Sequence, residues 1–243
     1  MPFPETESPQ IRYDWLGLAW NDYLDGLTVL FPVLLTLTVL NAPVFYLIDR
    51  YNSYLPALPY VLLVLAPLAT GSNLVYIKIA RGERTTFAAL FSAFPVYHRA
   101  LVVALWLGFI TVCGTLLFIL PGLVIYSTYC LSEYAVVDRR TGIRESFRLS
   151  ARLTHGWKGI IGFLVVLTVM MDILAPNPVY VTGALLQPVV GLDTTPWVLT
   201  AFCLKTFVFL PWLHMAMARI YNTLLLRPPG AAAGDAAGPP GEA

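Results

Sequence analysis

The chain has 243 residues, of which 58% are hydrophobic and only 12% are charged, and its mean hydropathy is +0.71. Soluble domains carry about 25% charged residues, so this composition excludes a soluble globular protein and favours a polytopic membrane protein. A net charge of +1 gives no overall field that would attract nucleic acid, and we expect no nucleic-acid partner. The three cysteines (Cys113, Cys130 and Cys203) are far apart in apolar runs, which indicates neither a zinc site nor a disulfide framework.

The N-terminal segment, residues 1–26, predicts an interfacial helix rather than a signal peptide. Residues 1–10 carry Glu5 and Glu7 and no positive charge, whereas a signal peptide opens with a basic region. Residues 11–25 then place apolar side chains at helical spacing between aspartates, and the run holds four aromatic rings. Tyr and Trp prefer the headgroup level, so we expect this helix to lie at the membrane surface and to lead into the first span.

Six apolar runs follow, and about 20 apolar residues suffice to cross about 30 Å of hydrocarbon. The predicted spans are residues 27–48, 55–77, 100–120, 123–137, 159–174 and 197–218. The expected fold is therefore an all-α transmembrane helical bundle of about six spans within residues 27–226. Prolines in the first two runs predict kinked helices. The fourth and fifth runs are short, and the alternative is that both are re-entrant elements, which leaves four true spans.

The segments between and after the spans differ in composition. Pro121-Gly122 predicts a tight turn between the third and fourth spans, and residues 176–196 predict a Pro-rich loop. A short amphipathic helix is expected within residues 85–94. Glycines at positions 156, 159 and 162 would let the fifth span approach another helix closely. Residues 227–243 are rich in Gly, Ala and Pro, a composition typical of disorder.

The basic residues are divided unequally between the two sides of the predicted bundle. With six spans, the side that holds both termini carries 13 of the 15 Lys and Arg residues. The other side carries Arg50, and Lys205 falls inside the last span. Cytoplasmic loops carry the Lys/Arg excess, so we expect a multi-pass protein of the bacterial cytoplasmic membrane with both termini in the cytoplasm.

The most basic stretch, residues 138–158, predicts a second amphipathic helix on the cytoplasmic side. Arg144, Arg148 and Arg152 recur every four residues and therefore share one helical face, and Arg139 and Arg140 precede them. A basic helix beside a span lies on anionic headgroups, so these five arginines are candidates for contact with membrane lipid or a protein partner. The alternative is that they serve only to fix the topology.

Three ionisable residues fall inside predicted spans, where such residues are functional candidates by default. Lys205 and Asp172 lie at similar depths, roughly 10–12 Å from the outer surface at about 1.5 Å per residue, so we expect an ion pair between the last two spans. A substrate or proton site, or snorkelling of Lys205 to the outer surface, are the alternatives. Glu133 lies about one turn from the cytoplasmic end of the fourth span, where it would reach water or Arg139.

The sequence contains no catalytic pattern. No HExxH, GxSxG, Walker or GxGxxG motif and no paired-carboxylate cluster is present, and His98, His155 and His214 are scattered. An intramembrane enzyme is disfavoured because no nucleophile and base come together. We therefore expect no enzymatic activity, no metal site and no cofactor.

Two stretches of sequence carry a family resemblance. One is ARGERTTF at residues 80–87, followed by Leu90, Phe91 and Phe94. The other runs from LPG at residues 120–122 through VVD at 136–138 and GIRESFRLS at 142–150 to THGW at 154–157, and Tyr221 and Leu224 also fit. Together they resemble the uncharacterised bacterial six-span proteins related to the membrane domain of glycerophosphoryl diester phosphodiesterases. The resemblance implies a fold and an inner-membrane location rather than an activity, because the phosphodiesterase barrel of the fused relatives has no counterpart here. Ser146 departs from the Ala usual in that family, and the loop at 176–196 is longer and richer in proline.

Two functions remain open from the sequence. The first is a non-enzymatic protein that organises lipid or a protein partner through the basic cytoplasmic helix. The second is a small transporter or flippase-like protein, for which broken helices near Pro32, Asn41 and Pro43 would supply unwound backbone. A closed apolar bundle would favour the first, whereas a hydrated cavity holding Lys205, Asp172 and Asn41 would favour the second.

Overall fold

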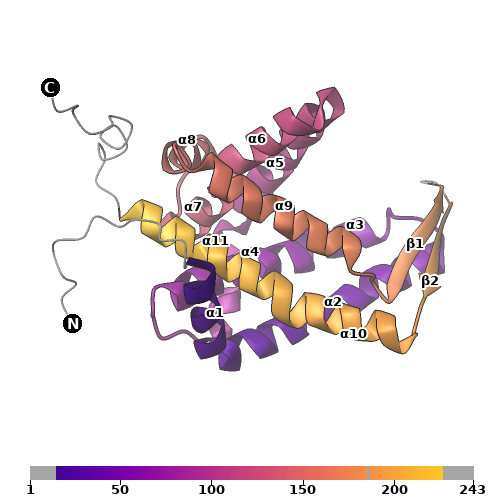
Figure 1. Cartoon of the computed structure of the whole chain (residues 1–243). Coiled ribbons are helices and arrows are strands. Elements are labelled where there is room, and N and C mark those ends of the chain that lie inside the picture. The colour runs from indigo at the N-terminus through magenta and orange to yellow at the C-terminus, as the bar shows by residue number, and fades with distance from the viewer. Residues whose placement is uncertain (1–14, 185–186, 227–243) are drawn as a thin grey trace, which may run out of the picture.

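A computed structural model describes residues 15–184 and 187–226, and most of these residues are helical (Figure 1). The first half of the chain forms α1 (Trp15–Asp25), α2 (Leu27–Tyr51), α3 (Ala57–Tyr60), the π-helix η1 (Val61–Leu65), α4 (Ala66–Ala80), the 3₁₀ turns η2 (Phe87–Phe91) and η3 (Phe94–Val96), and α5 (Tyr97–Leu117). The second half forms α6 (Ile119–Tyr129), α7 (Ser132–Arg139), α8 (Ile143–Leu153), α9 (Lys158–Leu174), β1 (Val179–Ala184), β2 (Gln187–Leu192), α10 (Pro196–Leu204), the π-helix η4 (Lys205–Phe209) and α11 (Leu210–Leu225). The predicted helical-bundle class is confirmed at this level.

Within the described residues, four helical stretches are long and apolar enough to cross a membrane: Leu27–Tyr51, Ala57–Ala80, Phe87–Leu117 and Pro196–Leu225. They correspond to the first, second, third and sixth predicted runs, and they indicate a multi-pass membrane protein. A fifth crossing results if α8 and α9 count as one span, although the two helices are bent by 109°. The fourth predicted run is divided between α6 and α7, and neither helix alone is long enough to cross.

The chain doubles back between α5 and α6 at Phe118, earlier than the predicted turn at Pro121-Gly122. Phe118 is extended (φ −162°, ψ 152°), and Pro121 lies in the first turn of α6, where its missing N–H has no helical partner to lose. A Cβ added to Gly122 would stand 2.0 Å from the Thr115 hydroxyl oxygen of α5. The Pro-Gly pair therefore starts a helix and lets it pack closely on α5, which forms the hairpin that projects from the bundle in Figure 1.

Two of the spanning stretches are interrupted by π-helical turns, and each of these turns precedes a proline. In the second predicted span η1 precedes Pro67, and in the last span η4 precedes Pro211. Pro211 has no N–H, so the carbonyl of Phe207 loses its usual α-helical donor. The hydroxyl of Tyr23 in α1 donates to that carbonyl at 2.5 Å instead. The proline break thus creates a docking point for the N-terminal helix.

The helix α1 lies within the segment predicted to form an interfacial helix, and it packs along α11. Besides the Tyr23 contact, the indole N–H of Trp212 donates to the carbonyl of Leu16 at 2.9 Å. Asp22 forms a salt bridge with Arg219 of α11. The part of the predicted interfacial segment before Trp15 and the predicted tail at 227–243 lie outside the described residues.

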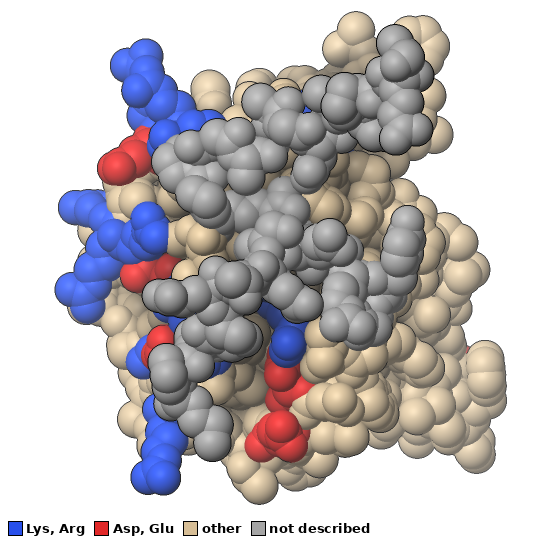
Figure 2. Space-filling model, turned by 60° about the vertical axis from the view of Figure 1, so that its left-hand side comes forward, with Lys and Arg blue, Asp and Glu red and all other residues tan. Residues whose placement is uncertain are grey.

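The predicted Pro-rich loop at 176–196 instead contains an antiparallel hairpin of β1 and β2, with Val179 opposite Leu192 and Thr182 opposite Val189. The strands are rich in Val, which suits extended backbone, but Pro188 and two glycines within them obscured the pattern. Figure 1 places this hairpin at the opposite end of the bundle from α8. Figure 2 shows that basic and acidic side chains gather at the end that carries α8, while uncharged residues cover most of the remaining visible surface.

Candidate functional site

A cavity of about 750 Å³ lies among α2, α4, α9, the last span and α7. Most of its lining is apolar, with Leu34, Leu37 and Phe45 from α2 among the contributors. Its polar lining residues are Thr38, Asn41, Ser72, Asn73, Tyr76, Glu133, Asp172, Asn177, Lys205, Thr206 and His214. Concave, mostly apolar cavities of about 300–1,000 Å³ with a few convergent polar groups are the usual form of small-molecule sites. The cavity is open to the surface, since Asn41, Ala69 and Asp172 in its lining are exposed, and it brings Asn41, Asp172 and Lys205 into one lining.

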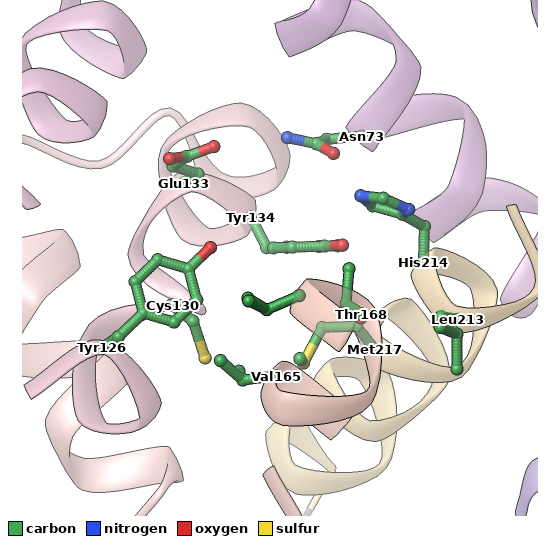
Figure 3. A pocket seen from close by; sticks show the side chains of 11 residues that line it. Asn73, Tyr126, Cys130, Glu133, Tyr134, Val165, Thr168, Leu213, His214 and Met217 are labelled. Atoms are coloured by element: carbon green, nitrogen blue, oxygen red, sulfur yellow. The ribbon is translucent and has the colours of Figure 1, made fainter. Parts of the chain in front are cut away.

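A second, smaller cavity of about 120 Å³ adjoins the first (Figure 3). Three residues line both cavities: Asn73 of α4, Glu133 of α7 and His214 of α11. Tyr126 and Tyr134 add two phenol rings to the wall of the smaller cavity, as Figure 3 shows. The two cavities therefore meet at a polar junction formed by three different helices.

Lys205 lines the larger cavity and has all its donors occupied. Its side chain is only 3% exposed, and Nζ lies 2.6 Å from Asn177 Oδ1, 3.1 Å from the Ala175 carbonyl oxygen and 3.4 Å from Asp172 Oδ1. The predicted contact between Lys205 and Asp172 is thus present, although the Asp172 side chain is 68% exposed. Because Ala175 directly follows α9, the ammonium also sits where a cation stabilises a helix C-terminus. These contacts hold α9 and its following linker against the last span.

Glu133 is half-buried, and its carboxylate lines both cavities, which does not contradict the expectation that it reaches water. The expected contact with Arg139 is absent, because the described part of the chain contains no hydrogen bond or ion pair to Glu133. Arg139 is exposed at the end of α7. The chain breaks between α6 and α7 at Cys130 and Leu131, and Leu131 is fully buried. The break turns α7 so that Glu133 faces the interior.

His214 is also part of this junction, whereas sequence analysis assigned it no site. Its Nδ1 lies 2.7 Å from the carbonyl oxygen of Leu210, and a carbonyl can only accept, so Nδ1 carries a proton. The imidazole stacks on the ring of Tyr76, with centroids 5.6 Å apart and planes inclined by 19°. In the neutral ring Nε2 is then left as an acceptor. Only its position on α11 relative to α4 and α7, which sequence does not give, brings it into the site.

The basic helix predicted after the fourth run is α8. The five candidate arginines are all exposed: Arg144, Arg148 and Arg152 lie in α8, Arg139 ends α7, and Arg140 follows it. The opposite face of α8 carries buried polar side chains. Ser150 and Thr154 on this face donate to the carbonyl of Thr128 at 2.8 and 3.1 Å. That carbonyl belongs to the last turn of α6, where helical donors run out. The serine and threonine of α8 therefore cap α6, and the arginines face outward.

The three glycines at the start of the fifth predicted span have separate roles rather than one shared packing role. Gly156 has φ +84°, a conformation that favours glycine, and forms the turn between α8 and α9. A Cβ on Gly159 would meet nothing within 4 Å. Only Gly162 lies close to another helix, with its added Cβ 3.2 Å from the hydroxyl oxygen of Ser127 in α6.

A polar network at the charged end joins the resemblance motifs, and sequence analysis assigned it no role. The guanidinium of Arg81 forms two hydrogen bonds to the carboxylate of Asp138, at 2.7 and 2.5 Å, and a third to Asn222 Oδ1 at 2.9 Å. The Tyr221 hydroxyl donates to Asp138 at 3.1 Å. The hydrogen bond with Asp138 raises the pKa of Arg81 above its ordinary value. The Arg81 network (Arg81, Asp138, Tyr221 and Asn222) thus ties together the ends of α4, α7 and α11.

Comparison of the chain with protein-family models, with curated proteins and with solved structures gives no match. The family resemblance therefore remains a prediction from the motifs. The site is defined by its geometry: two adjoining cavities with a paired lysine in the wall of the larger one and an unpaired carboxylate at their junction.

Proposed function

We propose that the protein binds an amphipathic ligand inside the membrane and acts as a small transporter or flippase-like protein. The observation that carries this proposal is the cavity of about 750 Å³, which Asn41, Asp172 and Lys205 all line. Its apolar walls suit an acyl or alkyl chain, and its polar groups suit a headgroup. The proposed role is binding and movement of a ligand, without chemical conversion.

The breaks expected near Pro32, Asn41 and Pro43 do not occur, because α2 is one continuous helix from Leu27 to Tyr51, but a π-helical turn of the last span lines the cavity and supports a transport role. The π-helix η1 interrupts the second predicted span and η4 interrupts the last, and Pro211 after η4 lines the cavity. Interrupted helices next to a binding site are characteristic of transporters, where the break allows one part of a helix to move relative to the other. Lys205 is the first residue of η4, so this π-helical turn begins in the wall of the cavity.

The proposed location is the bacterial cytoplasmic membrane, with six crossings and both termini in the cytoplasm. In this topology α6 and α7 together form the fourth crossing and α9 forms the fifth. The exposed arginines of α7 and α8 support this orientation, because cytoplasmic segments carry the excess of Lys and Arg. Location in the inner membrane would also agree with the family resemblance.

Lipid translocation by the purified protein in liposomes tests the proposal. Fluorescent phospholipids that become accessible to a membrane-impermeant quencher report movement between leaflets. Ala69→Trp fills the cavity from α4, and we expect it to abolish the acceleration that the unaltered protein produces. Gly108→Trp is the matched control, because a Cβ at Gly108 meets nothing within 4 Å. Absence of translocation by the unaltered protein, or equal rates for both variants, would refute the proposal.

A second candidate function uses α8. The arginines at 144, 148 and 152 are exposed and have no ion-pair partner in residues 15–184 and 187–226, which favours contact with anionic headgroups. In this role the protein would organise anionic lipid, or a protein partner in the membrane. Replacing all three by Gln should lower the co-purified anionic lipid measured by mass spectrometry, at roughly 1 kcal/mol of binding per charge. Arg84→Gln serves as the control, and unchanged lipid in the triple variant would remove this candidate.

A further inference from the structure

We infer that the ligand of the two cavities is an amphiphile with a cationic head, an alkylammonium group, and that this head binds beside Glu133. This inference rests on the proposed function, because it names the ligand class of the same site. The head would occupy the smaller cavity of about 120 Å³, and the chain would occupy the larger one of about 750 Å³.

The balance of charge in the lining favours a cation. Lys205 is the one Lys or Arg among the residues that line the larger cavity, and its three N–H donors already meet Asn177, Ala175 and Asp172. The other basic group, the imidazole of His214, has its Nδ1–H on the Leu210 carbonyl. An anionic head would therefore find no free donor on the ammonium. Glu133, by contrast, has no hydrogen bond or ion pair within the described residues. The charge available to a ligand is negative, and it lies where the two cavities meet.

The aromatic groups around Glu133 add a second reason. Figure 3 shows Tyr126 and Tyr134 lining the same small cavity as the Glu133 carboxylate. The faces of phenol rings attract ammonium groups, and a carboxylate beside two rings is a common arrangement for binding alkylated amines. Met217 and Val165 complete the wall with apolar groups that suit N-alkyl substituents. The negative charge of the Glu133 carboxylate would repel an anionic head in the same cavity.

The chain holds Glu133 in place through its neighbours rather than through the carboxylate. The Ser132 hydroxyl donates to the Tyr129 carbonyl at 2.6 Å, and Leu131 and Ser132 are fully buried. The start of α7 is thereby fixed against α6 while the Glu133 side chain stays free to accept a ligand. A site prepared in this way does not need to reorganise when the ligand binds.

Equilibrium dialysis of the purified full-length protein in dodecyl maltoside tests the inference, because this detergent carries neither a charge nor an amine. The probes are radiolabelled decyltrimethylammonium and decyl sulfate, two amphiphiles of equal chain length and opposite charge, with empty micelles as background. We expect the cation to bind more tightly than the anion. Glu133→Gln should weaken cation binding about tenfold, since it removes the Coulomb attraction to the ammonium and keeps the shape of the side chain. Glu145→Gln, an exposed carboxylate of α8, is the matched control and should leave both affinities unchanged.

Further variants separate the possible failures. Tyr126→Leu removes one ring face and should weaken cation binding several-fold even if Glu133→Gln is poorly folded. Ala69→Trp should abolish binding of both probes. If neither probe binds, or if Ala69→Trp leaves binding intact, the proposed function fails. If Ala69→Trp abolishes binding but decyl sulfate binds as tightly as the cation, or both Glu133→Gln and Tyr126→Leu bind the cation normally, the cationic-head inference alone is wrong.

A lipid or a free amphiphile could supply the ammonium head, and competition distinguishes these sources. Phosphatidylethanolamine carries an ammonium in its headgroup, whereas phosphatidylglycerol does not. Displacement of the cationic probe by phosphatidylethanolamine, but not by phosphatidylglycerol, would support the inference with a lipid as ligand. Displacement by decylamine alone would support it with a free alkylamine as ligand. Displacement by phosphatidylglycerol alone would overturn it.

Discussion

The Arg81 network and the cavity junction are both polar regions inside a largely apolar bundle, but they satisfy their polar groups to different extents. In the Arg81 network the carboxylate of Asp138 accepts from both Arg81 and Tyr221. At the cavity junction the carboxylate of Glu133 accepts from no group in the described residues. The first region lies where three helices end, and the second lies between the cavities.

This contrast separates structural polar groups from candidate functional ones. An unpaired polar group in apolar surroundings costs a few kcal/mol, so a fold retains one where it meets water or a ligand. Lys205 belongs with the Arg81 network by this criterion, even though it lines the cavity, because its donors are occupied. Stability measurements on single variants can test the division directly.

The largest effect is expected from Asp138→Ala. It leaves the Arg81 guanidinium and the Tyr221 hydroxyl without their shared acceptor, and we expect the free energy of unfolding in detergent to fall by about 2–4 kcal/mol. Glu83→Ala is the control, since Glu83 stands 3.8 Å from Arg81 with a side chain 48% exposed, and such a pair contributes at most about 1 kcal/mol. Equal losses in the two variants would mean that the network is not a structural clamp.

Lys205→Met should have the next largest effect, about 1–3 kcal/mol, because it frees the Asn177 and Ala175 oxygens and releases the linker before β1. Unfolding in detergent and the rate of proteolysis near Asn177 both report the change. Lys158→Met, at the exposed start of α9, is the control and should leave both measurements near their original values. If Lys205→Met is as stable as the control, the contacts of Lys205 do not stabilise the fold, and Lys205 would be a candidate functional group like Glu133.

One-dimensional patterns account for what the sequence could predict. The apolar runs, the arginine face of α8 and the Asp172–Lys205 contact all follow from spacing or depth along a helix. The Arg81 network joins residues 57 and 141 positions apart, so no local spacing could reveal it. The motifs of the family resemblance, which include Arg81, Asp138 and Tyr221, were the one available signal.

The interior position of Glu133 could not be predicted for a different reason. A continuous fourth helix would place Glu133 by its distance from the span end, but the chain breaks at Cys130 and Leu131, and α7 takes its own direction. Likewise, the β1–β2 hairpin needs strand pairing that Pro188 and two glycines conceal. In both places the local structure depends on where a helix or strand is interrupted, and a hydropathy pattern does not show that position.

A smaller effect, about 1 kcal/mol, is expected when a cap of α6 is removed. Ser150→Ala deletes the stronger of the two hydrogen bonds to the Thr128 carbonyl, while Thr154 still donates at 3.1 Å. Because the remaining donor keeps the carbonyl satisfied, the loss should stay well below that of Asp138→Ala. The double variant Ser150→Ala/Thr154→Val should lose more stability than the two single variants lose in sum, because only the double change leaves the carbonyl without a side-chain donor. A loss equal to that sum would show that the two hydroxyls do not share one acceptor.

The smallest effect on stability is expected from Glu133→Gln, within about 0.5 kcal/mol of the unaltered protein in the absence of ligand. No hydrogen bond or ion pair within the described residues is lost, and a neutral amide is less costly to bury than a carboxylate. The same change should remove most of the thermal stabilisation that decyltrimethylammonium gives the unaltered protein, because a ligand stabilises only the state it binds. A large loss of stability without ligand would show that Glu133 has a structural partner after all, and the division between paired and unpaired groups would then fail at the residue on which the ligand assignment depends.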